Sequence, residues 1–429
     1  MLLSTLALAV DNQELVKLIA PGMCEVIVAH DIIGRLMIQC ARQPGLAHVL
    51  ENLMGFDGDE FYLENWPELE GKTFNDVTFR FDDAVPIGIK CVDTGVIHIN
   101  PDSNMKIGKG DEILVLAEDN DSYSVNDGSY KSKAKVLKKD AKKGLSKEKM
   151  LFCGWRRDMY DMIIELDQYV APGSELWLLN MVPIADRAEM LKDMGHKEAL
   201  EVKNLVIKNA LGNPIVRRDL AKIMERDANG VETGNFVTLD QFDSLLILAD
   251  AVAIEAGADM ESSDSRSLAS LLIIQDIQRT LAAKRLAETG VKVELCNPIS
   301  EILDARTRSL LHVVDCKGYV MSNQIVSAAI SQVSECRDMN CVLQELLSSH
   351  GNEPYLRPAE WFISHEGEEL SFWDIAARTR EKQEVAIGYK DANVDWEDCV
   401  DNLLNPPDKR SVRKWSKSDL VIVISAAES

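Results

Sequence analysis

The chain has 429 residues, of which 70 are acidic and 47 are basic, and its formal net charge at pH 7 is −23. This length is enough for two or more domains with cores of their own. The acidic excess argues against non-specific binding of nucleic acid or of anionic membranes. It would suit a cation-binding protein, but a solvated, soluble surface is the simpler explanation.

The nine cysteines are scattered and include no C-x-x-C pair and no Cys/His spacing typical of a metal site. The closest pair, Cys336 and Cys341, falls on a predicted helix. Reduced, mostly buried thiols in a cytosolic-type compartment are therefore expected, without zinc. The apolar first ten residues are too short to span a membrane, and they lack the features of a signal peptide.

The first 118 residues predict helices followed by short strands. Residues 11–20 are predicted to form a helix that ends at Pro21-Gly22, and E-V-I-V-A-H is a buried-strand pattern. Two helices follow, and Asp31 can cap the first of them. From Glu60 to Glu118 short strands alternate with turns, and T-F-N-D-V-T-F-R-F is compatible with either a helix or a strand.

Residues 119–149 have the composition of a linker. An acidic run gives way to a lysine-rich run with few apolar residues, which predicts disorder or an exposed tether. The lysines could alternatively touch anionic lipid or phosphate.

Strands and helices alternate after the linker. Strands are predicted at L-F-C-G-W, E-L-W-L-L-N, N-L-V-I-K-N, S-L-L-I-L-A-D, V-K-V-E-L-C and G-Y-V-M-S-N, with helices between them. This alternation predicts an α/β fold, a Rossmann-like doubly wound parallel sheet with helices on both faces. The first turn reads Gly154, Trp155, Arg156, Arg157, so the G-x-G-x-x-G fingerprint of dinucleotide sites is absent.

The end of the chain repeats the beginning. G-K-T-F-N-D-V and V-P-I-G-I-K are followed by I-N-P-D and G-D-E-I-L-V-L-A-E, and the same order recurs in E-E-L-S-F-W-D-I, V-A-I-G-Y-K, L-N-P-P-D and S-D-L-V-I-V-I-S-A-A-E. We interpret this as a tandem duplication in which each sheet is followed by a small α+β lobe. The second copy has about five strands ahead of the matching region and the first has almost none. We therefore expect the first sheet to be truncated and the chain to be a fragment or a partial gene model.

Several long motifs are similar to those of a known family. A-H-D-I-I-G-R-L-M-I-Q-C-A-R-Q-P-G-L-A, L-F-C-G-W-R-R-D-M, A-P-G-S-E-L-W, L-I-L-A-D and D-S-R-S-L-A-S-L-L closely resemble the CASTOR/POLLUX ion channels, from about residue 11 to the C-terminus. The resemblance implies a subunit of a homotetrameric cation channel. Its pore would be followed by two RCK-type domains, and eight such domains would form a gating ring that responds to calcium. Plant members of the family lie in the nuclear envelope.

The resemblance also implies a division of the chain. Residues 1–58 would be the remnant of the first RCK Rossmann lobe and 59–120 its C-lobe. A charged linker would occupy 121–148, with the second Rossmann lobe at 149–350 and the second C-lobe at 351–429. The pore helices are absent from this chain, so any contact with a membrane would run through that missing region.

Two places could hold a ligand, because ligands of open parallel sheets bind beyond the carboxyl ends of the strands. The degenerate nucleotide-type cleft would use Gly154, Arg156, Arg157 and Asn180. An amide at Asn180 cannot accept both ribose hydroxyls as a carboxylate does, so NAD is not expected. The arginines could instead pair with carboxylates of a neighbouring domain.

The second place is an acidic loop that could supply oxygen ligands for Ca²⁺. Its candidate ligands are Asp250, Glu255, Asp259, Glu261 and Asp264. The spacing is not that of an EF-hand, and Asp264 is also a good N-cap for the long helix that follows. Asp82 and Asp83 form a further acidic pair in the first β region.

No nucleophile–base arrangement emerges, and enzymatic activity is not expected. The leading hypothesis is a regulatory module in which ligand binding shifts a two-state ring. The alternatives are a soluble nucleotide-binding sensor or oxidoreductase and a structural assembly module without a ligand.

Overall fold

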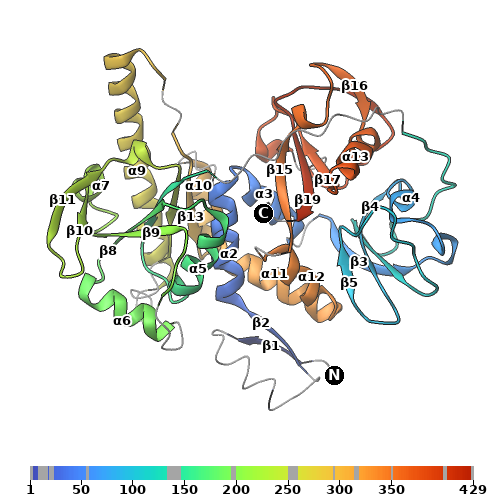
Figure 1. Ribbon diagram of the computed structural model, residues 1–429, viewed down its shortest axis with the longest axis horizontal. Helices are drawn as coiled ribbons and strands as arrows, with labels where there is room; N and C mark the ends of the chain where they lie inside the picture. Colours follow the sequence, from blue (N-terminus) through green and yellow to red (C-terminus); the bar gives the residue numbers. More distant parts are fainter. Residues whose placement is uncertain are drawn as a thin grey trace. The chain divides into compact units, whose positions relative to one another are not determined.

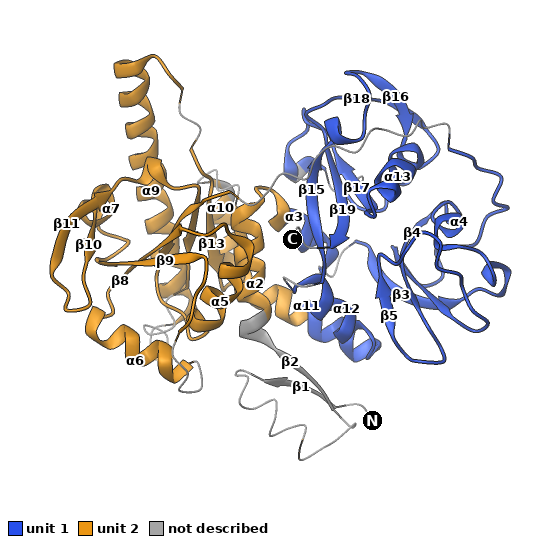
Figure 2. Cartoon of the chain, viewed as in Figure 1, with its two compact units in different colours: residues 1–4, 48–142, 328–429 blue, residues 5–47, 143–327 orange. Residues whose placement is uncertain are grey.

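The computed structural model describes residues 3–7, 18, 24–54, 58–132, 146–194, 200–249, 259–292, 295–313, 318–348, 351–399 and 403–426. The chain divides into two compact units (Figure 2). Unit 1 comprises residues 1–4, 48–142 and 328–429, and unit 2 comprises residues 5–47 and 143–327. The two units are defined by which residues pack together and not by the repeat in the sequence. The domain boundaries expected from the resemblance therefore remain a prediction.

Unit 2 is built on an eight-stranded sheet of order β11-β10-β9-β8-β7-β12-β13-β14 (Figure 1). Six neighbouring strands of this sheet are parallel, namely β9, β8, β7, β12, β13 and β14. In chain order they run third, second, first, fourth, fifth, sixth, which is the order of dinucleotide-binding domains. The expected Rossmann-like parallel sheet is thus confirmed. The strands are β7 (Lys149–Cys153), β8 (Ser174–Asn180), β9 (Leu205–Leu211), β10 (Ile223–Arg226), β11 (Glu232–Val237), β12 (Ser244–Ile247), β13 (Pro298–Ile302) and β14 (Tyr319–Met321).

Helices pack on this sheet. They are α2 (Ala29–Arg42), α5 (Met159–Tyr169), α6 (Ile184–Met194), α7 (Arg217–Ala221), α9 (Met260–Thr289) and α10 (Arg308–Val313), with 3-10 turns η2 (Leu239–Gln241) and η3 (Ala305–Thr307). The core between sheet and helices includes Leu151, Trp177, Leu245 and Ile274, each less than 5% exposed. The C-terminal part of α9 projects beyond the sheet (Figure 1), and most of its residues there are exposed.

Two expectations for this region are wrong, and one feature was not anticipated. The predicted fifth strand at 291–296 is replaced by β13, because Val291 is 62% exposed whereas all five residues of β13 are buried between two parallel neighbours. The hairpin of β10 and β11 was not expected. The long helix is capped by Asp259, whose side chain accepts the Ser262 N–H, and not by Asp264.

Unit 1 contains three antiparallel sheets, of orders β3-β6-β4-β5, β15-β19-β17 and β16-β18. Their strands are β3 (Glu60–Asn65), β4 (Ala84–Lys90), β5 (Ile97–Ile99), β6 (Glu112–Ala117), β15 (Asn352–Pro358), β16 (Glu368–Ser371), β17 (Val385–Lys390), β18 (Val412–Trp415) and β19 (Leu420–Ala426). Strands β1 (Leu3–Ala7) and β2 (Cys24–Val28) form a separate two-stranded sheet. The helices of unit 1 are α4 (Phe74–Val77), α12 (Met339–Leu346) and α13 (Phe372–Glu381). Two further helices begin in unit 2 and end in unit 1: α3 (Leu46–Leu53) and α11 (Ser322–Glu335). The 3-10 turns of unit 1 are η1 (Pro67–Leu69), η4 (Ala359–Trp361) and η5 (Trp396–Asp398).

The repeat seen in the sequence recurs in the geometry of unit 1. Strand β4 is paired to β6 with a register shift between Pro86 and Gly88, and β17 is paired to β19 with the same shift between Ala386 and Gly388. Helices α4 and α13 each begin with a capping box, formed by Thr73 with Asp76 in α4. The stretch 73–81 therefore starts as a helix, which resolves the alternative left open by its sequence.

Two asparagines join the repeats reciprocally. The Asn100 amide donates to the Gln383 carbonyl at 2.6 Å, and the Asn405 amide donates to the Asp83 carbonyl at 2.9 Å. Both asparagines adopt positive φ angles, 48° and 41°. Asp83 and Gln383 each lie three residues before the register shift of their own repeat, which begins at Pro86 and at Ala386, so the two contacts are pseudo-symmetric.

The stretch after β6 is not an exposed tether over its whole length. Tyr123 is 7% exposed, and the Tyr130 ring packs edge-on against Trp373 with 4.6 Å between ring centroids. Burial of the two aromatic rings outweighs the polar composition around them. Residues 133–145, which hold most of the lysine run, lie outside the described residues.

The bulge in β17 provides a test of this packing. A Cβ atom on Gly388 would lie 1.8 Å from the Leu403 carbonyl oxygen, which is backbone and cannot move aside alone. Gly388→Ala should therefore destabilise unit 1 by roughly 2 kcal/mol or more, measured by chemical denaturation. Gly71→Ala is the control: its Cβ would meet nothing within 4 Å, although φ is +77°, so it should cost only about 1 kcal/mol. Equal losses in both variants would contradict the described packing.

Candidate functional site

The turn after β7 occupies the place of the phosphate-binding loop in a dinucleotide fold. Gly154 has a φ of +112°, and a Cβ there would lie 2.7 Å from the Leu248 carbonyl oxygen. Only glycine fits this close approach to the end of β12. Trp155 follows and is 1% exposed, so a large buried side chain stands where a glycine-rich turn would have a small residue.

Arg156 lies at the centre of a buried ionic network. Its guanidinium donates to both carboxylate oxygens of Asp158, at 2.7 and 3.0 Å, and also to Glu301 on β13. Glu301 in turn accepts the Ala249 N–H at 2.9 Å and the Ser322 hydroxyl at 2.8 Å. The network therefore joins the first turn to the ends of β12, β13 and β14.

The charges in this network stabilise one another. The exposed fractions of Arg156, Asp158 and Glu301 are 4%, 6% and 2%. Burial alone disfavours the Glu301 carboxylate, but Arg156 and the two further donors hold the Glu301 pKa below its usual range. Burial likewise opposes the Arg156 charge, and the pairing with Glu301 and Asp158 overcomes that effect and raises the Arg156 pKa.

Of the predicted cleft residues, Arg156 therefore pairs with carboxylates of its own unit. Arg157 is exposed, unlike Arg156. Asn180 ends β8, and its side-chain oxygen accepts the Val182 N–H at 3.0 Å. Its buried amide nitrogen lacks a partner among the described residues.

The space beside Gly154 and Asn180 is small. A cavity of about 30 Å³ lies there, and Ser263, Ser267 and Ser270 of α9 form part of its lining. That volume suits one or two water molecules. The described residues therefore do not fit a dinucleotide, because the arginine is already neutralised by carboxylates and the space beside it is small.

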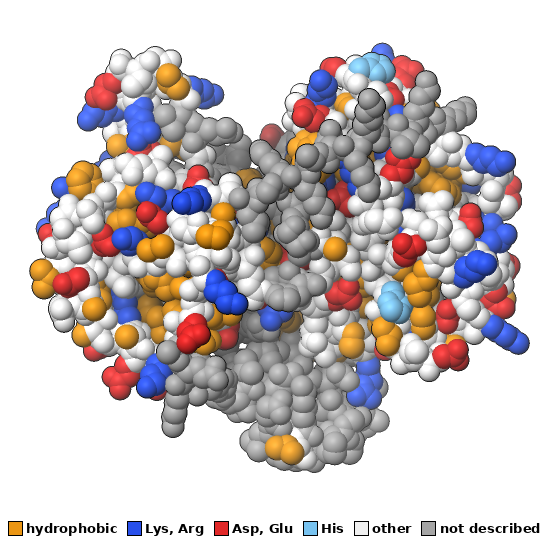
Figure 3. Space-filling view, viewed as in Figure 1, with side chains coloured by type: hydrophobic (Ala, Val, Ile, Leu, Met, Phe, Trp, Pro, Cys, Tyr) orange, Lys and Arg blue, Asp and Glu red, His pale blue; other side chains and the backbone are white. Residues whose placement is uncertain are grey.

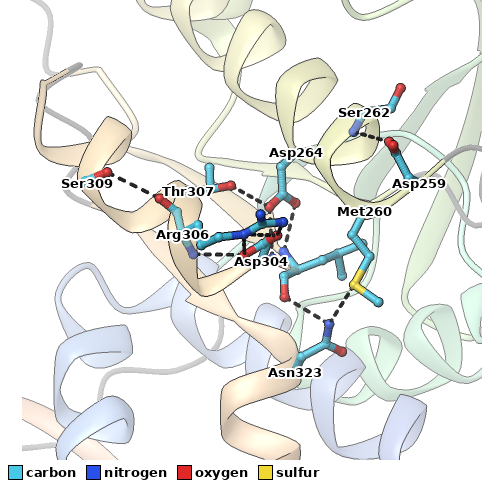
Figure 4. A network of polar contacts seen from close by, with 10 residues as sticks. Asp259, Met260, Ser262, Asp264, Asp304, Arg306, Thr307, Ser309 and Asn323 are labelled. Carbon is cyan, nitrogen blue, oxygen red and sulfur yellow. Dashed lines mark hydrogen bonds and ion pairs between the residues drawn. The ribbon is translucent and has the colours of Figure 1, made fainter.

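Only part of the acidic loop falls within the described residues: Asp250 and Glu255 lie outside them. Asp259 caps α9, and Glu261 is exposed. The Asp264 side chain points toward the loop after β13 (Figure 4), where it accepts the backbone N–H groups of Leu303 and Asp304 at 2.8 and 2.9 Å and the Thr307 hydroxyl at 2.9 Å. Asp264 is thus engaged as a structural acceptor.

The other acidic pair is also partly engaged. Both carboxylate oxygens of Asp82 accept from the Arg410 guanidinium, at 2.8 and 3.0 Å. Within the described ranges, no group of three or more His, Cys, Asp or Glu side chains is placed to hold a metal ion. On the face seen in Figure 3, acidic side chains are interspersed with lysines and arginines, so the negative charge is not gathered into one patch there.

Comparison with known proteins agrees with this architecture. Residues 30–133 match a family model described as "Castor and Pollux, part of voltage-gated ion channel". The chain is 43% identical to the probable ion channel POLLUX of Oryza sativa subsp. japonica over 97% of its own length, and 42% identical to the ion channel CASTOR of Lotus japonicus over the same share. The chain belongs to the CASTOR/POLLUX family. It spans 42% and 48% of the length of these two relatives.

The fold of this CASTOR/POLLUX chain can also be compared with a solved structure of another protein. The human SLO3 gating ring superposes with a TM-score of 0.65, covering 99% of this chain and 81% of that one at 12% identity. At this identity the likeness concerns the fold alone, and it confirms a gating-ring type of α/β architecture. Within the described residues, no helix combines the length and apolarity needed to cross a membrane.

The partners of Arg156 were missed by reasoning from sequence. Asp158 stands two residues further along, and Arg-x-Asp is too common a pattern to single out. Glu301 carries a stronger signal, since it is an acid inside the apolar stretch P-I-S-E-I. A carboxylate in a strand buried on both faces requires a charged or hydrogen-bonding partner.

Truncating Arg156 tests the network. Arg156→Met leaves the two buried carboxylates without their cation, so unit 2 should lose about 3–5 kcal/mol of unfolding free energy. Arg157→Met is the matched control, because that side chain is exposed, and it should change stability by less than about 0.5 kcal/mol. Chemical denaturation followed by tryptophan fluorescence measures both. A similar, small effect of both substitutions would contradict the assigned role.

Proposed function

We propose that this chain is the regulatory gating-ring region of a homotetrameric CASTOR/POLLUX-type cation channel. The observation that carries the proposal is the match along the whole chain: 97% of it aligns with channel relatives and 99% with a solved gating ring. In the longer protein, four copies would assemble through their RCK-type domains beside a pore. Ligand binding would then favour one of two ring arrangements and so bias the pore. The nuclear envelope is the membrane proposed by analogy with plant members.

We further propose that Ca²⁺ is the ligand and that the acidic loop from Asp250 to Asp264 contributes to its site. Calcium favours oxygen ligands, and several carboxylates follow one another closely in the sequence of this loop. Because the Asp264 carboxylate is engaged, the exposed Glu261 and the capping Asp259 are the described residues best able to contribute. The ring would thus act without enzymatic chemistry, as its relatives are named ion channels.

Calorimetric titration with calcium, combined with light scattering, tests this proposal. The chain should release or absorb heat and change its oligomeric mass at up to millimolar calcium. Asp259→Asn with Glu261→Gln should weaken binding about tenfold or more, since asparagine preserves the helix cap while both charges are lost.

The control for that experiment is Glu189→Gln, which removes one exposed charge elsewhere in unit 2 and should bind as the parent chain does. Absence of heat and of any change in mass would refute the calcium assignment. Equal weakening in the control would instead indicate diffuse attraction to the acidic surface.

The rival function, a nucleotide-binding sensor or oxidoreductase, gives a distinct expectation. A ligand that binds the folded state raises the melting temperature in proportion to the logarithm of its concentration over its dissociation constant. Because Arg156 is neutralised internally and the cavity beside it is small, millimolar NAD or NADP should leave the melting temperature unchanged. A clear concentration-dependent rise, abolished by substitutions at Asn180, would favour the rival.

A further inference from the structure

A groove of about 460 Å³ lies within unit 1, apart from the cleft and the acidic loop. One wall is β3, from Glu60 to Glu64, together with Asn120 and Tyr123. The other wall is formed by Gln332, Glu335, Cys336 and Met339, at the end of α11 and the start of α12. Its volume falls in the range of small-molecule sites.

The groove is negatively charged. Glu60 and Glu64 alternate with Tyr62 along β3, so the three side chains share one face of the strand. Glu335 faces them from the other wall, and neither lysine nor arginine lines the groove. The Tyr62 pKa is raised by burial first and then by Glu60, with Asp119 and Glu335 adding to the effect, as expected in a negative potential.

One wall carries polar atoms without partners. Gln332 is 7% exposed, and neither its amide oxygen nor its amide nitrogen has a partner in the part of the chain that the structure describes. Leaving a buried amide without hydrogen-bond partners is unfavourable. A ligand with N–H groups in the groove would offset part of that cost.

The edge of the sheet adds further acceptors. Strand β3 is the end strand of its sheet and pairs with β6 alone. The carbonyl oxygens on its outer edge therefore accept no hydrogen bond from another strand of the sheet. The groove thus offers carboxylate, carbonyl and amide oxygens, all of which are hydrogen-bond acceptors. They suit a ligand that carries several N–H donors.

The arrangement of the carboxylates favours an elongated cation over a metal ion. Residues four apart in a strand are separated by roughly 13 Å, so Glu60 and Glu64 cannot ligate the same ion. Consistent with this, no metal-holding group of three such side chains occurs among the described residues. The half-buried Tyr62 ring lies among these acids, 6.3 Å from the Tyr123 ring between centroids, and an aromatic face attracts cations.

We propose that this groove binds a linear polyamine. Its ammonium groups would pair with Glu60, Glu64 and Glu335, its methylene chain would lie against Tyr62, and the Gln332 oxygen would accept from an inner nitrogen. The proposal does not rest on the gating-ring function, since it uses only the residues of unit 1.

Calorimetric titration of the full chain with spermidine tests the proposal. We expect one spermidine per chain, with binding weakened about tenfold or more by Glu60→Gln with Glu64→Gln. Because those substitutions alter a strand, Glu335→Gln on the opposite wall provides a second variant and should also weaken binding. Butylamine, with a single ammonium group, should bind at least about tenfold more weakly than spermidine.

The matched control is Glu68→Gln, an exposed acid of the same unit that does not line the groove, and it should bind spermidine as the parent chain does. Absence of spermidine binding, or equal weakening by Glu68→Gln, would overturn the proposal. So would displacement of spermidine by a lysine-rich peptide of higher affinity, which would identify the groove as a protein-docking surface.

Discussion

The organisation of unit 2 depends on one buried guanidinium. In a dinucleotide-binding domain the first turn is left open so that backbone N–H groups reach a pyrophosphate. Here Arg156 occupies that turn, and Asp158 and Glu301 provide the negative charge that a phosphate would otherwise bring. Since the partners come from the turn itself and from β13, the chain satisfies internally the site that its fold would offer to a nucleotide. The doubly wound sheet is thereby retained as a structural element.

In unit 1 the main structural feature is the way in which two small repeats are joined. Each repeat places an asparagine at positive φ, and its amide donates to the carbonyl that precedes the bulged strand of the other repeat. Arg380 adds a second link from α13 to the first repeat, by donating to the Pro101 carbonyl at 2.7 Å. Reciprocal contacts of this kind bind the two repeats into one body.

The fold class was accessible from sequence because alternating βα segments and a long-period repeat leave few topologies. The fifth strand was misplaced because V-K-V-E-L-C alternates like a half-buried strand, whereas the true strand P-I-S-E-I is buried on both faces and contains an acid. Tyr123 and Tyr130 were assigned to a tether because local composition does not reveal which aromatic rings find a partner. The site was predicted least well, since Arg156 was singled out while its partner Glu301 lies 145 residues away. Long-range pairing of charges leaves no periodic signal.

The most direct test of this account is a double-mutant cycle on the buried pair. Unfolding free energies would be measured for the parent chain, Arg156→Met, Glu301→Gln and the double variant. If the two charges neutralise each other inside the sheet, the double variant should lose less stability than the two single losses combined, by about 1–3 kcal/mol. Losses that add within about 0.5 kcal/mol would mean that the two residues act independently, and would contradict the claim that an internal ion pair stabilises the turn where a dinucleotide fold binds phosphate.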